Sequence, residues 1–243
     1  MKRIIGLLAL VAMLMLPAAS FPAGDQVGGY VAPKFVYGFT QIDGVKLHWS
    51  HMGDSGSERV GSRTDSTFGG SLAVGYDFEK KFGVPLRAEL EYAGFSTAEA
   101  KRSYTFDDER MTLKQKFNIQ TLFLNAYWDI DTGTQFTPYL GAGIGMGFIK
   151  TKGTETGYLV SDPTDSWANS TSSKNVTNVA WNIGAGLGYD ITDNWTLDVG
   201  YRFVGLGSVK TKTYRYNDSD SSIYGKTKNL YQHQVSLGAR YTF

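Results

Sequence analysis

Apolar and polar residues alternate at every second position in eight segments of this chain. In the clearest segment Leu140, Ile144 and Phe148 lie on one face, and glycines occupy the positions between them. Successive side chains of a β-strand point to opposite faces, so a period of two indicates a strand whose faces meet different surroundings. The pattern predicts eight strands, over residues 30–41, 67–78, 85–96, 115–130, 137–150, 178–190, 195–209 and 231–243.

The connections between these strands alternate in length. Three are short and rich in Asp, Gly, Asn and Lys, at 77–84, 129–135 and 190–194, a composition typical of turns. Four are long and polar, at 42–66, 97–114, 151–177 and 210–230. This alternation is typical of an even-stranded membrane barrel. We expect an all-β fold, an eight-stranded antiparallel up-and-down transmembrane β-barrel with short periplasmic turns and four long extracellular loops.

Side-chain volume decides which face of the strands points outward. An eight-stranded barrel is just wide enough inside for side chains to fill it. The apolar face carries most of the Trp, Tyr, Phe and Leu residues, and the other face carries Gly, Ser, Ala and a few charges. We therefore expect Leu140, Ile144, Leu187 and Val199 to face lipid, because water does not tolerate so large an apolar belt. A soluble lipocalin-type barrel, which also alternates, is the last alternative.

Aromatic residues gather at both ends of the apolar belt. Phe39, Phe148, Trp181 and Phe203 lie toward the long connections. At the short-turn ends we expect a periplasmic aromatic girdle of Tyr76, Trp128, Tyr189 and Trp195, followed by Tyr241 and Phe243 of the closing strand. Two such girdles match the two interfaces of a membrane.

The fourth predicted strand departs from the simple rule. If the apolar residues at the even positions of this strand face outward, Phe123 and Tyr127 must point inward. Counting residues through the short turn then places Phe123 near Gly141 on the next strand. We expect these rings to cover the glycine row of the next strand. Phe117 and Ile119 fit the opposite parity, which predicts a bulge near Gln120.

The N-terminus has the pattern of a secretory signal peptide. Two basic residues precede an apolar run from Ile4 to Leu16, and small residues follow. The run is shorter than the roughly 20 residues of a spanning helix. We expect a signal peptide over residues 1–23, with cleavage near 20–23, and a barrel domain over 24–243 in the outer membrane of a Gram-negative cell.

Composition narrows the chemistry. The chain has no cysteine, which excludes disulfides and thiolate sites. The formal net charge is +1 with acids and bases dispersed, so nothing indicates a nucleic-acid partner. No cofactor is indicated.

Seven charged residues fall on the inward face of the predicted strands. Because opposite charges in a narrow lumen should pair, we expect a salt-bridged network that plugs the barrel. The alternative is a narrow ion or small-solute channel. The residues are Lys34, Arg87, Glu89, Glu91, Asp198, Arg202 and Arg240.

The three histidines raise two further alternatives. His48 and His51 form a His-x-x-His pair in a long connection, but no set of further ligands is fixed, so we expect no metal. His233 lies near the outer rim and serines such as Ser219, Ser221 and Ser222 are abundant. Some outer-membrane barrels modify lipopolysaccharide acyl chains with a His, a Ser and an acid, so a lipid-modifying enzyme stays open, although we expect no enzyme.

Aromatic residues are scattered through the polar connections. They are either adhesion contacts, because Tyr and Trp anchor interfaces, or packing within the loops, and both interpretations stay open. They include Trp49, Tyr104, Tyr158, Trp167, Tyr214 and Tyr216.

Several runs carry a family resemblance. The segments 137–145, 85–92 and 197–203, with the closing strand 231–243, resemble the opacity-protein and OmpA-transmembrane-like family of surface antigens. The resemblance implies a barrel with lumen charges at the positions of Arg87, Glu89 and Arg202. It also implies that Tyr241 and Phe243 form the C-terminal insertion signal for the barrel-insertion machinery.

We therefore expect an outer-membrane barrel with a structural or surface-interaction role, adhesin-like or antigen-like, through its extracellular loops. The expected partners are outer-membrane lipid and lipopolysaccharide, the insertion machinery during biogenesis, and an extracellular ligand that the sequence does not identify.

Overall fold

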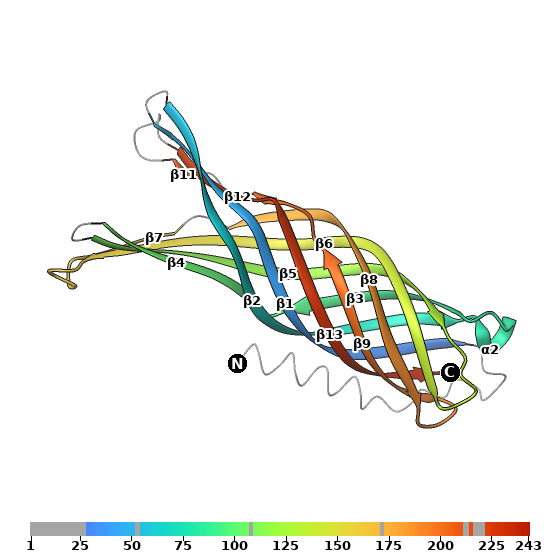
Figure 1. Ribbon diagram of the computed structural model, residues 1–243. Helices are drawn as coiled ribbons and strands as arrows, with labels where there is room; N and C mark the ends of the chain where they lie inside the picture. The colour runs from blue at the N-terminus through green and yellow to red at the C-terminus, as the bar shows by residue number, and fades with distance from the viewer. Residues whose placement is uncertain (1–27, 52–53, 107–108, 171–172, 211–213, 216–221) are drawn as a thin grey trace.

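A closed antiparallel β-barrel dominates the structure, a computed structural model that describes residues 28–51, 54–106, 109–170, 173–210, 214–215 and 222–243. Each barrel strand pairs with the next in sequence, and β1 pairs with both β2 and β13, which closes the ring. This confirms the predicted eight-stranded fold (Figure 1). The barrel strands are β1 (Gly29–His51), β2 (Asp54–Asp77), β3 (Leu86–Phe95), β5 (Glu109–Asp129), β6 (Phe136–Leu159), β8 (Lys174–Asp190), β9 (Trp195–Gly205) and β13 (Asn229–Thr242).

The short connections lie together at one end of the barrel. The first contains the single-turn helix α2 (Glu79–Phe82), which ends at Gly83 with a left-handed φ of 65°. In the second, the Asp131 carboxylate accepts the backbone N–H of Gly133 at 2.8 Å, a local bond typical of turns. No helix among the described residues is long and apolar enough to cross a membrane.

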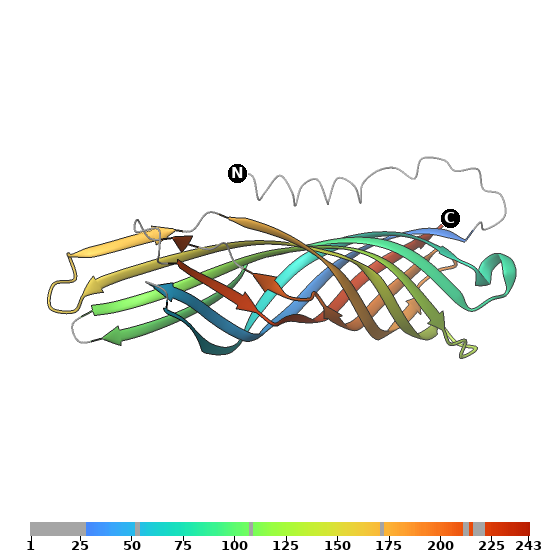
Figure 2. The same ribbon diagram turned by 90° about the horizontal axis from the view of Figure 1, so that it is seen from above.

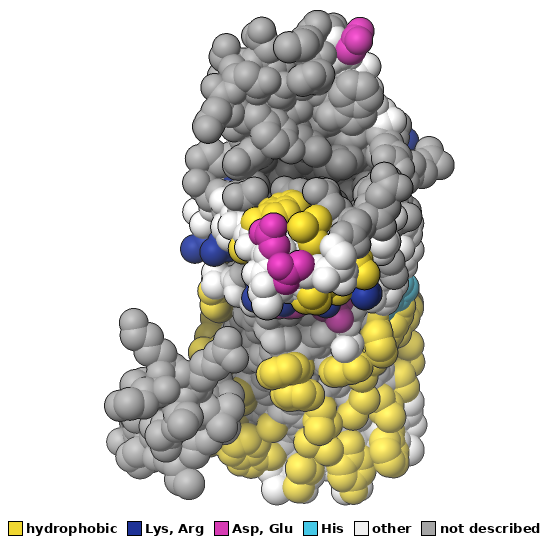
Figure 3. Space-filling view, turned by 90° about the vertical axis from the view of Figure 1, so that its left-hand side faces the viewer, with side chains coloured by type: hydrophobic (Ala, Val, Ile, Leu, Met, Phe, Trp, Pro, Cys, Tyr) yellow, Lys and Arg dark blue, Asp and Glu magenta, His cyan; other side chains and the backbone are white. Residues whose placement is uncertain are grey.

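An apolar belt covers the outside of the barrel. Leu140, Ile144, Leu187 and Val199 are between 40% and 62% exposed, as the volume of the lumen predicts. Figure 3 shows apolar side chains gathered over the barrel wall and charged ones on the structure beyond it. In water this surface would be costly, whereas lipid accommodates it.

The four long connections are largely paired strand, because the barrel strands extend beyond their predicted ends. Two arms of paired strands extend past the belt, and Figures 1 and 2 show them diverging from the barrel. Arm one consists of the outer ends of β1 and β2 with β10 (Val209–Lys210), β11 (Tyr214–Arg215) and β12 (Ser222–Thr227). Arm two consists of β4 (Ala98–Phe106), the outer ends of β5 and β6, and β7 (Ser166–Ser170).

The ring of strands opens where β2 separates from β4. The β2–β3 ladder ends at the pair Gly69 and Phe95. Beyond it, the Asp65 carboxylate accepts the backbone N–H of Glu99 at 2.7 Å, so a side chain replaces the missing ladder bond. On β1 the pairing with β2 shifts register between Ile42 and Lys46. Sequence alternation alone carries no sign of this opening, since both strands keep alternating through it.

Strand β5 runs without the predicted bulge near Gln120. Its pairing with β6 is continuous from Glu109 to Asp129. Phe117 and Ile119 therefore keep the parity of Phe123 and lie fully buried inside the barrel. The prediction failed because it assumed that large apolar residues face outward throughout the strand.

The register of β5 on β6 also corrects the predicted partner of Phe123. Phe123 lies opposite Gly145, and Tyr127 lies opposite Gly141. A Cβ placed on Gly141 would be 2.5 Å from Cδ1 of the Tyr127 ring. The expected aromatic cover is therefore present at Gly141, where Tyr127 and not Phe123 provides it.

The outer half of the lumen is apolar, which the sequence reading did not predict. A single buried cluster contains Phe117, Phe123, Ile149, Val204, Leu206 and Leu230, contributed by β5, β6, β9 and β13 with the segments next to them. Among the described residues, the ion-paired side chains of Lys34, Glu91, Arg87, Asp198 and Arg202 lie in the half nearer the short turns. The lumen therefore has two layers of different chemistry.

The glycine row gives a folding prediction. We expect Gly145→Ala to reduce the folded fraction, because the added methyl group would overlap the Leu122 carbonyl oxygen and the Phe123 Cα, which are backbone atoms. Overpacking of this kind costs about 1–3 kcal/mol or more. Heat-modifiable gel mobility, in which the unboiled barrel runs ahead of the boiled one, measures the folded fraction.

The matched control is Gly94→Ala, since nothing lies within 4 Å of its added Cβ. Equal folding yields for the two variants would contradict the close approach of β5 to β6.

Candidate functional site

All seven charged residues predicted for the lumen point into it. They come from β1, β3, β9 and β13 and are buried or nearly so. Glu89 and Glu91 are the most enclosed carboxylates among them, at 2% and 1% exposure. Strand alternation places all seven charged side chains in the lumen, because the residues before and after each of them in the strand face the lipid.

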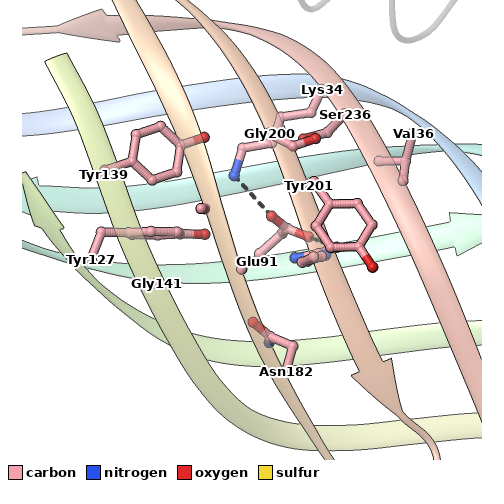
Figure 4. A pocket seen from close by; sticks show the side chains of 13 residues that line it. Lys34, Val36, Glu91, Tyr127, Tyr139, Gly141, Asn182, Gly200, Tyr201 and Ser236 are labelled. Carbon is pink, nitrogen blue, oxygen red and sulfur yellow. Dashed lines mark hydrogen bonds and ion pairs between the residues drawn. The ribbon is translucent and has the colours of Figure 1, made fainter.

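Glu91 lies at the centre of the charge network. Its carboxylate accepts bonds from Lys34 Nζ at 2.9 Å and from Arg202 Nη2 at 2.5 Å. Lys34 also donates to Glu89 Oε1 at 2.7 Å, and Figure 4 shows Lys34 directed at Glu91 across the lumen. Two cations thus face two carboxylates, so the buried charges of this group balance.

Arg87 forms the second ion pair, with a partner that the sequence reading missed. Its guanidinium donates Nε and Nη2 to the Asp129 carboxylate at 2.6 and 2.8 Å, a bidentate geometry. The Tyr127 and Tyr139 ring centroids lie 5.0 and 4.9 Å from its Cζ. Asp129 lies where the predicted strand 115–130 overlaps the predicted turn 129–135, and the inward parity that it shares with Tyr127 is the sequence signal for this position.

Arg240 and Asp198 form the third pair, nearest the short turns. Arg240 Nε lies 3.6 Å from Asp198 Oδ2, which is an ion pair without a hydrogen bond at that atom. The Arg240 Cζ lies 5.5 Å from the Tyr30 ring centroid. The Tyr30 hydroxyl in turn donates to Glu89 at 3.3 Å, which links this pair to the central group.

Neutral polar side chains connect the charges to the apolar layer above. Arg202 Nε donates to Gln234 Oε1 at 2.5 Å, and Gln234 donates to Gln232 Oε1 at 2.6 Å. Gln232 then donates to the hydroxyls of Thr40 and Thr67, both at 3.1 Å. Alternation in the sequence predicts only that Gln232 and Gln234 lie on the polar face of the closing strand.

The cavities left in this network are small. One has a volume of about 30 Å³ and is lined by Lys34, Glu91, Tyr127 and Arg202 among others; Figure 4 shows it from close by. A second, of about 10 Å³, lies beside Arg87 and Asp198. Cavities of this size hold single water molecules. The described lumen is thus filled by a charged layer and an apolar layer.

The predicted girdle residues lie at the short-turn ends of their strands. Trp128 and Trp195 are 56% and 42% exposed, and Tyr76 and Tyr189 are half-buried. The Tyr241 ring centroid lies 5.0 Å from that of Trp195 and 5.4 Å from that of Phe243. The closing strand therefore joins the girdle through its last aromatics.

His233 lies on the outer surface of the barrel. Its Nδ1 is 2.8 Å from the Tyr201 hydroxyl, and its ring packs on Phe203. Ser219 and Ser221 lie outside the described residues, as do the side chains of Ser222, His48 and His51. Among the described residues, no three His, Cys, Asp or Glu side chains gather in a way that could hold a metal.

One arm aromatic packs within its own sheet. The Trp167 ring lies over Gly157 on the neighbouring strand, close enough to leave no room for a Cβ there. Tyr158 is half-buried on the adjacent position. For Trp167 this favours packing over a free contact. Tyr216 and the side chains of Trp49, Tyr104 and Tyr214 lie outside the described residues.

The profile of a known family, described as the outer membrane protein beta-barrel domain, matches residues 7–243. The chain belongs to this outer-membrane β-barrel family. Its location is therefore the cell outer membrane, and the apolar belt is the surface that lies in the lipid. This confirms the resemblance to barrel surface antigens and excludes the soluble barrel. The predicted signal peptide lies outside the described residues and stays a prediction.

Individual relatives agree with the family. Outer membrane protein PagN of Salmonella typhimurium is 28% identical over 231 residues, which cover 93% of this chain and 94% of PagN. A putative adhesin of Rickettsia conorii is 26% identical over 180 residues, covering 74% of this chain and 69% of that protein. Among solved structures, the outer membrane protein OprG of Pseudomonas aeruginosa has the same fold, with a TM-score of 0.51, 14% identity and coverage of 90% and 99%.

The charge network gives a stability prediction with an internal control. We expect Glu91→Gln to destabilise the barrel by about 3–5 kcal/mol, because it leaves the buried charges of Lys34 and Arg202 undercompensated. Urea unfolding of the barrel in lipid vesicles, followed by tryptophan fluorescence, measures the change.

Glu99→Gln is the matched control, because Glu99 also binds two cations, Lys114 and Lys116, but on the exposed surface of arm two. Solvent screens that pair, so we expect little change. Equal effects of the two substitutions would show that burial adds nothing to the Glu91 network.

The two-layer filling predicts the electrical behaviour of the lumen. In planar bilayers we expect no steady conductance from the folded protein. The triple variant Phe117→Ala, Ile119→Ala, Phe123→Ala should also stay closed, because the charged layer remains below. A large, steady conductance of the unsubstituted protein would contradict a filled lumen.

Proposed function

We propose that this outer-membrane barrel is a non-enzymatic attachment protein whose two arms present contact surfaces to an extracellular ligand. The observation that carries the proposal is the continuity of the strands. The β5–β6 ladder runs unbroken from Trp128 in the belt to Glu109 in arm two. An arm held by a ladder loses less conformational freedom on binding than a flexible loop.

The filling of the lumen supports a role at the surface. With ion pairs in one half and an apolar cluster in the other, the barrel serves as an anchor for the arms. The resemblance to a putative adhesin, which is the name of the Rickettsia protein, points the same way. The environment of His233, next to Tyr201 and Phe203 on the lipid-facing surface, gives no specific support for catalysis.

The proposed partners follow from position. The belt would contact outer-membrane lipid, with lipopolysaccharide in the outer leaflet. Tyr241 and Phe243 would serve as the insertion signal during biogenesis, because they end the closing strand that β1 must capture. The extracellular ligand would bind the arms.

Trimming the arms tests the proposal. The residues between register partners can be replaced by an Asn-Gly turn, which suits two-residue hairpins. The three variants replace 48–57, 104–111 and 157–167, which join Leu47 to Glu58, Ser103 to Thr112, and Thr156 to Ala168. Displayed on a non-adherent Gram-negative strain, the full-length protein should confer adherence to cultured epithelial cells, and at least one trimmed variant should lose it.

Gel mobility and surface labelling confirm that each variant is folded and displayed. Ser substitutions at Asp131 and Thr134, in a short turn at the other end, should leave adherence unchanged. Adherence of all three trimmed variants at the full level, or none from the full-length protein, would overturn the attachment role.

A further inference from the structure

The outward face of arm two is strongly basic. Among the described side chains, this face of β4, β5 and β6 carries one acid, Glu99, and six bases, which are Lys101, Arg110, Lys114, Lys116, Lys150 and Lys152. The parity is fixed by the belt, because Leu122 and Leu124 share it and the β5–β6 register has no shift. We call these seven residues the basic face.

The register places like charges directly opposite one another. Lys116 faces Lys152 on β6, and Lys114 faces Lys101 on β4. Like charges directly opposite destabilise a strand pair. The arrangement therefore disfavours the sheet by itself, and an anion that bridges the strands would relieve the repulsion.

Glu99 neutralises only part of this charge. Its carboxylate binds Lys114 Nζ at 2.7 Å and Lys116 Nζ at 3.0 Å. The hydrogen bonds from Lys114 and Lys116 hold the pKa of Glu99 below its ordinary value, so it stays ionised. Six positive charges against one negative leave a net charge of +5, calculated as 6 − 1 over the described side chains of this face.

The basic face begins one step beyond the apolar belt. The last belt position on these strands is the pair Gln120 and Phe148, and the next outward pair is Asn118 and Lys150. Lys116 and Lys152 follow two residues later. With a rise of about 3.4 Å per residue and a strand tilt of about 40°, these pairs lie roughly 5 and 10 Å above the belt. Lipid headgroups occupy about 5–8 Å beyond the hydrocarbon core. The first pair therefore lies within that layer, and Lys116 and Lys152 lie just above it, where their flexible four-carbon side chains can reach it.

The basic face continues the lipid-facing side of the barrel wall. Its residues on β5 lie on the same face of that strand as Leu122 and Leu124, since the ladder with β6 has no register shift. In Figure 3, Lys and Arg side chains lie on the flanks of the arm that faces the viewer, and acidic ones lie at its front.

We propose that the basic face binds the phosphate groups of lipopolysaccharide in the outer leaflet. Each lysine ammonium has three donors for phosphate oxygens, and a phosphate between Lys116 and Lys152 would relieve their mutual repulsion. The proposal rests on the lipopolysaccharide contact named under the proposed function. It does not depend on the adhesive role.

The test uses the full-length protein, folded in detergent and titrated with diphosphorylated or dephosphorylated lipid A in mixed micelles. We expect the protein to prefer the diphosphorylated form. In the variant Lys116→Gln, Lys152→Gln, its affinity for that form should fall roughly ten- to thirtyfold. Its affinity for the dephosphorylated form should not change.

The matched control is Lys226→Gln, Lys228→Gln, which removes the same charge beside arm one, where both residues are exposed. Its affinity for the diphosphorylated lipid should stay within twofold. An equal fall in both variants would show an effect of net charge alone, and equal binding of the two lipids by the unsubstituted protein would show no phosphate site. Either result overturns the proposal.

Titration with a sulfated polysaccharide tests whether the basic face binds an extracellular polyanion and not a lipid headgroup. If it binds with the same dependence on Lys116 and Lys152 and displaces the lipid at equal charge concentration, the face belongs to an extracellular polyanion and the proposal is wrong. The 104–111 trimming keeps Lys114 and Lys116, so loss of adherence and loss of lipid binding are separable.

Discussion

Closure of the backbone hydrogen-bond ladder is the constraint on which the rest of this protein depends. Inside a bilayer no water satisfies an unpaired N–H or C=O group, so only a ring without edges is stable there. The pairing of β1 with both β2 and β13 supplies that ring. Once the ring is closed, strand alternation sends one set of side chains into lipid and the other into a narrow lumen.

The lumen shows how a narrow interior is filled. Near the short turns, opposite charges balance around Glu91, and Asp129 holds Arg87 through two bonds. Toward the arms, Phe117, Phe123 and Leu206 fill the same bore without polar groups. The two layers meet at Gln232 and Gln234, whose amides link the charges to buried hydroxyls. A buried charge without a partner is costly, and Gln234 gives the Arg202 guanidinium a second partner beside Glu91.

The arms are continuations of the barrel strands into water, where an unpaired strand edge is no longer forbidden. Beyond the belt, water can satisfy strand edges, so the ring opens between β2 and β4, where the Asp65 carboxylate takes over one backbone bond. The two sheets then diverge as separate arms. The outward parity of β5 continues through the opening, which turns the lipid-facing stripe of Leu122 and Leu124 into the lysine-rich stripe of arm two.

The sequence alone determined the number of strands, the faces of the barrel and the lumen charges, because a period of two follows directly from strand geometry and the bore of eight strands limits side-chain volume. It did not determine how far the strands extend. A polar hairpin such as 97–114 has no apolar face, so its sequence lacks the alternation that marks a strand. Only the backbone pairing in the structure distinguishes it from a loop. It did not give Asp129 as the partner of Arg87, or the apolar layer, because side-chain partners on neighbouring strands depend on the register of each ladder. Phe123 lies opposite Gly145 and not Gly141, since the turn and the ladder of the β5–β6 hairpin set a register that counting residues through the turn does not fix.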